Sequence, residues 1–372
     1  MVKPLKVAVI GAGRLGGFHA RKLAQNNRAE LVAVVDPLPA NRNRVAEACH
    51  TQPKAAYHEL LDRLDAVVIA APTGLHHRLA MDFLDHGIHV LVEKPICSTV
   101  AEADQLVQTA GRNKLVLQVG HVERFNPAFT AAVPYAQNPK YVEAVRTSGF
   151  TFRSTDVGVV LDLMIHDLDL ILSMVRSPVR KVDALGLSVL GGHEDVANAR
   201  LEFECGCVAV LSASRVSYEP IRRMSVWSAR AFANVDFAGR TTTLVRPSET
   251  LLRRQFDVDA LSAEQVEYYK EHFAGEHLPK QVEQYDAVDA LALESEEFIE
   301  SVAAARPPLV TGEAGRDALA VAERILAKIH AHAWDGAPGG PVGPMAAPRP
   351  HVVPAPHFPV ASNTPALRRE AG

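Results

Sequence analysis

The sequence predicts two domains in series: an α/β domain built on a doubly wound parallel sheet, then an α+β domain with a large, mostly antiparallel sheet. Two observations carry this prediction. A glycine-rich turn near the N-terminus joins an apolar run to a helical segment, and apolar runs then alternate with helical patterns. Beyond residue 126, strand-like segments follow one another with only short turns between them. The length of 372 residues also favours two domains over one.

The glycine-rich turn has the spacing of a dinucleotide-binding site. Gly11 permits the turn, Gly13 lets a pyrophosphate approach the backbone, and Gly16 lets the following helix pack close to the strand. The helix N-terminus offers free N–H groups and a positive dipole end to phosphates. We therefore expect a Rossmann-type NAD-binding site, in which Arg14 and Leu15 of the same turn also contact the cofactor.

A carboxylate at the end of the second apolar run favours NAD over NADP. Asp36 lies about 20 residues past Gly16, where a carboxylate accepts hydrogen bonds from the adenosine ribose diol. Its negative charge repels a 2′-phosphate. Arg42 and Arg44 follow closely and weaken this preference, so NADP stays open as the less favoured cofactor.

The first sheet is expected to have helices on both faces. Its candidate strands are residues 7–10, 31–35, 66–71, 90–92 and 115–119. Helical patterns such as 80–84 and 101–110 separate them, and strands that are apolar on both sides indicate a covered parallel sheet.

The second domain is expected to begin with a long helix over residues 159–174. The strands predicted after it are residues 181–190, 196–204, 208–214, 224–227, 231–237 and 241–245. Two amphipathic helices, 286–304 and 315–332, are expected to close this domain. The predicted boundaries are 1–125, 126–334 and a tail, 335–372, whose Pro/Ala/Gly-rich composition predicts disorder and no catalysis.

Composition excludes several classes of protein. A formal net charge of -4 and 48% hydrophobic residues indicate neither a nucleic-acid footprint nor a disordered acidic chain. The N-terminus shows no signal-peptide pattern, and charges within the apolar window 157–175 argue against a membrane span. The four cysteines form no C-x-x-C pair, so we expect reduced thiols and a cytoplasmic protein.

Chemistry is expected at the carboxyl ends of the parallel strands, where such sheets bind ligands. After the third candidate strand come Pro72, which ends the strand, and Thr73, whose hydroxyl is expected near the nicotinamide. We expect His76 either to support a helix N-terminus or to contact the cofactor. After the fourth strand comes Glu93-Lys94-Pro95, in which partial desolvation suits Lys94 to acid or base chemistry.

The tripeptide Glu93-Lys94-Pro95 has two interpretations. We expect a cis bond before Pro95 to aim Lys94 into the cleft, with Glu93 facing the cofactor. As an isolated motif, however, Glu93 and Lys94 would be an ordinary solvated charge pair.

Residues 120–127 join the two domains, and ligand sites form in such gaps. We expect Arg124 and Asn126 to bind substrate, the alternative being a linker with ordinary surface charges.

On the long helix, Asp162 and His166 are four residues apart and are expected to be in contact. A neutral histidine oriented by a carboxylate can take a proton from a hydroxyl group. A capped core histidine and a zinc pair are the alternatives; no third ligand is placed, so no metal site is predicted.

These motifs together resemble the glucose-fructose oxidoreductase, inositol dehydrogenase and rhizopine-catabolism (Gfo/Idh/MocA) family over about residues 6–332. Glu93-Lys94-Pro95, Asp162-x-x-x-His166 and the following Asp169 carry the resemblance. It implies that His166 is the acid/base, that Lys94 hydrogen-bonds the reacting hydroxyl or shares its proton, and that Asp162 binds substrate hydroxyls or orients the pair. It also implies a homodimer or homotetramer.

Residues 120–127 and 163–167 look like the branch of this family that contains the UDP-N-acetylglucosamine 3-dehydrogenases. Met164 and Ile165 depart from the glycine that many members carry near this histidine. Cations available for a diphosphate are Arg124, Arg153, Arg215, Arg222 and Arg223. The resemblance thus implies oxidation of the sugar 3-hydroxyl; alternatives are a dehydrogenase of free cyclic polyols or simple sugars, and a non-catalytic NAD-sensing protein.

Overall fold

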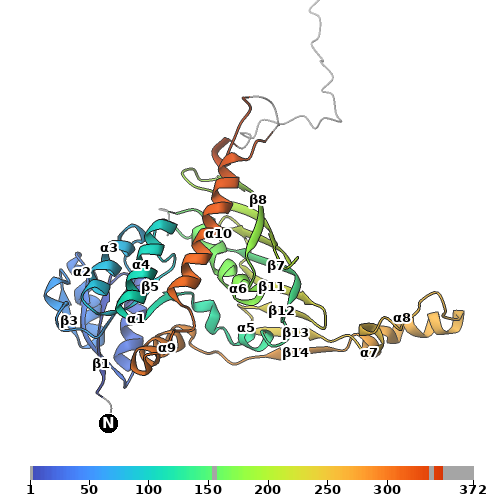
Figure 1. Ribbon diagram of the computed structural model, residues 1–372, viewed down its shortest axis with the longest axis horizontal. Helices are drawn as coiled ribbons and strands as arrows, with labels where there is room; N and C mark the ends of the chain where they lie inside the picture. Colours follow the sequence, from blue (N-terminus) through green and yellow to red (C-terminus); the bar gives the residue numbers. More distant parts are fainter. Residues whose placement is uncertain (1–2, 153–156, 335–338, 347–372) are drawn as a thin grey trace, which may run out of the picture.

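The computed structural model describes residues 3–152, 157–334 and 339–346. Two sheets lie side by side, and helix α10 (Gly312–Ala331) runs between them (Figure 1). None of the described helices is long and apolar enough to cross a membrane.

The N-terminal sheet is parallel and doubly wound, as predicted. Its strand order is β3-β2-β1-β4-β5-β6. The strands are β1 (Leu5–Ile10), β2 (Ala29–Val35), β3 (Gln52–Lys54), β4 (Ala66–Ile69), β5 (His89–Glu93) and β6 (Leu117–Gly120). Strand β3 was not predicted, because Gln52-Pro53-Lys54 contains no apolar run.

Helices cover both faces of this sheet. They include α1 (Arg14–Gln25), α2 (Pro39–Cys49), α3 (His76–Asp85), α4 (Val100–Asn113) and α9 (Ala290–Ala304). In β1, Val7 and Val9 enter the core on one face and Ala8 and Ile10 the core on the other. Burial on both faces explains why these strands read as continuous apolar runs.

The position of α9 corrects one prediction. We expected residues 286–304 to help close the second domain, but Phe298, Ile299 and Val302 pack into the core beneath β1, and α9 lies against α1. An amphipathic pattern shows that one face is buried, and tertiary packing decides against what. The chain therefore returns to the first sheet after building the second.

The C-terminal sheet has the order β14-β13-β12-β11-β7-β10-β9-β8. The strands are β7 (Pro139–Thr147), β8 (Val179–Leu187), β9 (Val196–Phe203), β10 (Val208–Ser214), β11 (Ile221–Ser228), β12 (Phe232–Asp236), β13 (Thr241–Val245) and β14 (Lys280–Gln284). All neighbours are antiparallel except β7 and β10. The central β7 and the edge strand β14 were not predicted.

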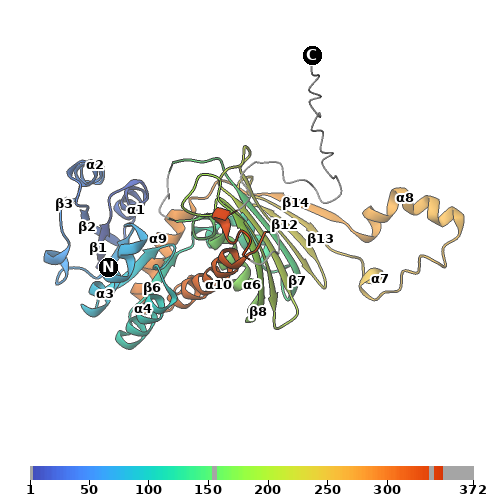
Figure 2. The same cartoon turned by 90° about the horizontal axis from the view of Figure 1, so that it is seen from above.

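One face of this sheet packs against helices α5 (Pro127–Ala132), α6 (Ile165–Val175) and α10 (Figure 2). The helix predicted over 159–174 is not uniform, because a π-helical turn (Val160–Met164) precedes α6. π-Helical turns are frequent at functional sites.

Between β13 and β14 the chain forms an arm that projects away from the sheets, with α7 (Glu249–Leu252) and α8 (Ala263–His277) (Figures 1 and 2). No residue from 246 to 289 is buried. The arm nevertheless has a capping box at Ser262 and Gln265.

Part of the tail is ordered, against our prediction. Residues 339–346 fold back: Val342 bridges to Ala333, and the Trp334 indole donates a hydrogen bond to the Gly343 carbonyl at 2.9 Å. Pro344 O accepts from Ser188 N just past β8. The rest of the predicted disordered tail, 335–338 and 347–372, lies outside the described residues.

Candidate active site

A groove runs along the carboxyl ends of the parallel strands. A cavity of ≈ 660 Å³ is lined by Gly11, Gly13 and Asp36, and a second, of ≈ 460 Å³, is lined by Lys94 and Asp162. The two cavities share their lining residues Leu15, Ala70, Ala71 and Pro72. The groove therefore leads from the expected ribose end of a dinucleotide to the expected catalytic residues.

The glycines have the geometry that the motif predicts. Gly11 has φ +93°, and a Cβ there would lie 2.5 Å from the Ala70 carbonyl oxygen. A Cβ on Gly16 would lie 1.7 Å from the Gly11 oxygen, so the turn and the helix need both glycines. Gly13 has nothing within 4 Å of its missing Cβ. That open space suits the close approach of a pyrophosphate.

Asp36 is fixed at the far end of the groove. Its Oδ2 accepts a hydrogen bond from Ala12 N at 2.8 Å, and its Oδ1 accepts one from Leu38 N at 2.9 Å. Arg42 donates to the Asp36 and Pro37 carbonyl oxygens, and Arg44 donates to the Ala12 carbonyl oxygen. Both guanidinium groups are thus engaged by the backbone, which supports the prediction that NAD is preferred.

We expect Asp36→Ala to raise KM for NAD by at least about 10-fold, since a charge-assisted hydrogen bond contributes about 1.5–3 kcal/mol. The ratio of kcat/KM for NAD to that for NADP should fall, because the charge that repels a 2′-phosphate is gone. Steady-state kinetics with both cofactors measure this. An unchanged ratio would exclude Asp36 as the residue that selects the cofactor.

Lys94 connects the two domains. It follows β5, its bond to Pro95 is cis as predicted, and its Nζ donates to the Asp162 carbonyl oxygen at 2.6 Å and to Asp162 Oδ1 at 3.1 Å. The ring nitrogens of His76 lie 2.8 Å from the Ala71 O and 2.9 Å from the Pro95 O. His76 therefore braces the Lys94–Pro95 turn against the strand end before it. It also lines the cavity that contains Lys94, so its contact with the cofactor stays a prediction.

His166 lies near the start of α6 and lines neither of the two cavities of the groove. Burial, and then the positive charges of Lys94 and Arg146, hold its pKa well below the usual value. Its Nδ1 is buried with no hydrogen-bond partner among the described residues, and its ring meets His121 edge-on at 6.2 Å. The imidazole is consequently neutral at pH 7 and able to accept a proton.

Asp162 does not have the contact that we predicted. Its carboxylate binds Lys94, and the described residues include no hydrogen bond between it and His166. Asp162 lies in the π-helical turn and His166 lies in α6, so they do not share the regular helix that the spacing assumed. Asp162 orients Lys94 instead.

The two predicted substrate-binding residues in the linker have structural partners. Arg124 donates to both carboxylate oxygens of the buried Asp169, at 2.6 and 2.9 Å. Asn126 caps α5 by accepting from Ala128 N, and its Nδ2 donates to Glu123 and to the Phe237 carbonyl oxygen. A buried carboxylate on an apolar helix needs a cation, and a helix start needs a cap.

Comparisons with known proteins identify the family of this chain. A family model described as "Oxidoreductase family, NAD-binding Rossmann fold" matches residues 5–121, and one described as "GFO/IDH/MocA C-terminal domain" matches residues 119–231. The UDP-N-acetylglucosamine 3-dehydrogenase of Acidithiobacillus ferrooxidans is 34% identical over 332 residues, which are 88% of this chain and 98% of that protein. The chain belongs to the Gfo/Idh/MocA family. It is therefore an oxidoreductase that uses NAD.

Other Gfo/Idh/MocA proteins align over most of their length. The Thermotoga maritima myo-inositol 2-dehydrogenase is 26% identical and covers 85% of this chain and 93% of that protein. The solved structure of UDP-N-acetylglucosamine 3-dehydrogenase GnnA from Acidithiobacillus ferrooxidans has a TM-score of 0.76 at 33% identity, covering 88% of this chain and 98% of that one.

The sequence analysis missed a cluster of buried charged residues next to His166. Arg146 of β7 donates to both carboxylate oxygens of Asp167, at 2.9 and 2.8 Å, and to Glu123 at 2.7 Å. Its positive charge is one that lowers the pKa of His166. The alternation of buried and exposed residues in β7 was the available signal, but this central strand was not recognised.

Proposed function

We propose that this protein oxidises a secondary hydroxyl of a sugar nucleotide, namely the 3-hydroxyl of UDP-N-acetylglucosamine, to the 3-keto sugar with NAD. The observation that carries the proposal is the meeting of Lys94 from the first domain with Asp162 from the second at the end of the groove, with a neutral His166 one turn farther on. The similarity to UDP-N-acetylglucosamine 3-dehydrogenase supports the choice of substrate.

In this proposal each residue has one task. His166 accepts the hydroxyl proton, Lys94 donates a hydrogen bond to the reacting oxygen, and Asp162 holds the Lys94 ammonium in place. NAD, when bound, supplies the acceptor for the hydride that leaves the same carbon. Holding the oxygen and the base in one geometry is the larger part of what the protein contributes.

The diphosphate of a nucleotide sugar requires a cation that solvent can reach. The side chain of Arg222 on β11 is 53% exposed, and its ion pair with Glu123 is long, at 3.9 Å. Its positive charge is among those that lower the pKa of His166, so it lies near the catalytic base. Arg215 instead pairs with Asp195, and Arg153 lies outside the described residues.

We expect Arg222→Ala to raise KM for UDP-N-acetylglucosamine about 10-fold, the loss of roughly 1.4 kcal/mol of binding, with KM for NAD unchanged. Initial-rate kinetics with each substrate varied in turn measure both constants. Arg223→Ala is the matched control, because Arg223 neighbours it and pairs with Asp236 at 3.5 Å. Equal effects of the two substitutions would show a general charge effect and no specific contact.

A screen of NAD reduction tests the proposed function itself. UDP-N-acetylglucosamine, myo-inositol and glucose should be compared at equal concentration. Turnover of the sugar nucleotide alone supports the proposal, and turnover of myo-inositol or glucose supports the polyol alternative that inositol dehydrogenase relatives suggest. NAD binding without any reduction would favour the NAD-sensing alternative.

We also propose a homodimer or homotetramer that covers the open face of the eight-stranded sheet. On the face away from α6, the Trp227 ring contacts those of Tyr141 and Phe232 at tilted angles. The ring centroids are 5.0 and 4.9 Å apart, and Trp227 remains 36% exposed. The arm, which extends from the same sheet, contains the helix α8 but no buried residue. Contact with a partner subunit would offset the conformational entropy that is lost when this helix forms. Light scattering on the eluting protein should give the mass of two or four chains, whereas a monomer at assay concentration would contradict this proposal.

We also propose a cytoplasmic location, because the four cysteines are free thiols.

A further inference from the structure

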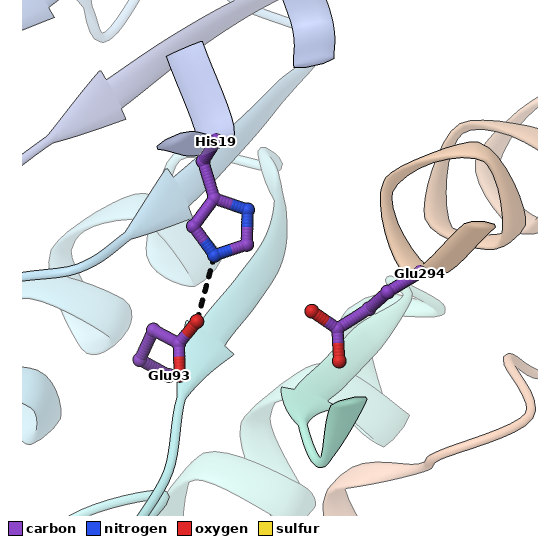
Figure 3. Close-up of side chains that lie close together, drawn as sticks. All are labelled: His19, Glu93 and Glu294. Carbon is purple, nitrogen blue, oxygen red and sulfur yellow. Dashed lines mark hydrogen bonds and ion pairs between the residues drawn. The ribbon is translucent and has the colours of Figure 1, made fainter. Parts of the chain in front are cut away.

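Three buried side chains meet beneath the Lys94 turn. His19 comes from α1, Glu93 ends β5, and Glu294 comes from α9; they are 0%, 7% and 0% exposed. Figure 3 shows the Glu93 carboxylate hydrogen-bonded to the His19 ring, with the Glu294 carboxylate turned toward the pair. The His19 Nε2 to Glu93 Oε1 distance is 2.7 Å. Of the three, only Glu93 was expected to be functional, and it was expected to face the cofactor.

The Glu93 carboxylate is held on several sides. Its Oε1 accepts from His19, and its Oε2 accepts from the backbone N of Lys94 at 3.2 Å. Gly120 of β6 closes the remaining space, since a Cβ there would lie 2.8 Å from Glu93 Oε2. The carboxylate therefore connects a side chain of α1 to the backbone of Lys94.

The geometry suits a proton between His19 and Glu93 better than a metal ion. The nearest ligand atoms of the three residues lie within 4.8 Å of one another, which is the range of a metal site. Ligands of a tetrahedral zinc ion at about 2.1 Å stand roughly 3.4 Å apart, however, and 2.7 Å is the length of a charge-assisted hydrogen bond.

The charges of the cluster agree with this. Burial raises the pKa of Glu93, but His19 and then Lys94, each through a hydrogen bond and its charge, together outweigh burial and hold that pKa below its usual value. Burial and the negative charges of Glu93 and Asp169 hold the pKa of Glu294 well above its usual value. Glu294 is thus a neutral acid, and neither of its oxygens has a hydrogen-bond partner among the described residues.

We propose that His19 is a positioning residue for the dehydrogenase reaction, linking the cofactor-binding helix α1 to Lys94 through the Glu93 carboxylate. The proposal rests on the function proposed above, in which Lys94 holds the reacting oxygen. Helix α1 begins at Arg14, at the groove, and His19 lies on it little more than one turn later. The hydrogen bonds from His19 to Glu93 and from Lys94 N to Glu93 then hold the catalytic turn in register with the cofactor site.

Three variants test the link. His19→Ala removes the donor and should lower kcat about 10- to 100-fold, since a displacement of about 1 Å can cost that much. KM for NAD should stay within about twofold. His19→Gln keeps an N–H donor at similar reach and should restore most of the lost kcat. Glu294→Gln is the control, because an amide replaces a neutral acid that makes no hydrogen bond within the described chain, and it should leave kcat unchanged.

The outcomes separate the alternatives. Wild-type kcat in a folded His19→Ala protein, or equal loss in His19→Ala and His19→Gln, would overturn the proposal. A stoichiometric divalent metal in the purified protein that is lost together with activity in Glu294→Gln would overturn it in favour of a metal site. Thermal unfolding of each variant shows whether it folds.

A second readout does not depend on the substrate. The rate at which an acylating reagent modifies Lys94 Nζ, followed by peptide mass spectrometry, should rise in His19→Ala and return to the wild-type rate in His19→Gln. If the wild-type protein turns over no sugar, the proposed function fails, and this readout alone decides the role of His19. An unchanged acylation rate in His19→Ala would then overturn it.

Discussion

Substitution of His166 by alanine is expected to lower kcat by about 1,000-fold, within the range of roughly 100- to 10,000-fold that a general base contributes. In the proposed function this imidazole is the base, and burial and the charges of Lys94 and Arg146 hold its pKa low. NAD affinity should be unchanged, because the larger cavity of the groove, which contains Gly13 and Asp36, is lined by residues of the first domain.

Stopped assays and NAD titration by fluorescence measure the two quantities. His121→Ala is the matched control: His121 also has a pKa lowered by burial, yet it is 1% exposed with both ring nitrogens buried, whereas His166 is only partly buried. A much smaller effect is expected from it. If His121→Ala lost as much activity as His166→Ala, the base would have been assigned to the wrong histidine.

Substitution of Lys94 by methionine should lower kcat by about 100-fold or more and should also change the pH profile. His166 must be neutral to act as a base, so kcat/KM rises with pH through the pKa of His166 and then levels off. Because that pKa lies below its usual value, the wild-type protein should keep full activity below pH 6.5.

Lys94 is the largest electrostatic cause of that low pKa after burial. Its removal should therefore raise the pKa of His166 and move the acidic limb of kcat/KM toward higher pH. Lys94→Arg, which keeps the charge, should leave the limb in place while still lowering kcat. A limb that does not move in Lys94→Met would mean that Lys94 and His166 are not electrostatically coupled.

Local motifs predicted the backbone geometry at the carboxyl ends of the parallel strands well. The glycines of the first turn, Asp36 and the cis bond before Pro95 all depend on residues near one another in sequence, so spacing and residue type carried the information. The alternation of apolar runs and helices likewise indicated the parallel sheet, because both of its faces are buried.

Local sequence patterns could not predict the tertiary contacts. His19 and Glu93 are 74 residues apart, and nothing local to either one marks the hydrogen bond between them. Arg124 and Asp169 were each noticed, but as separate features, since no spacing rule joins residues on different elements. The placement of α9 on the first sheet depends on the return of the chain after 289 residues, which an amphipathic pattern does not encode.

The most direct test of the account uses UDP-N-acetylglucosamine carrying deuterium at C3 of the sugar. The account predicts that the deuterium is transferred to the reduced cofactor, seen as a mass increase of NADH by one unit, with a slower kcat/KM than for the protiated substrate. Reduced cofactor that carries no deuterium would show that another carbon is oxidised. No reduction of NAD by this sugar nucleotide, from a folded protein that binds NAD, would contradict the proposed activity itself.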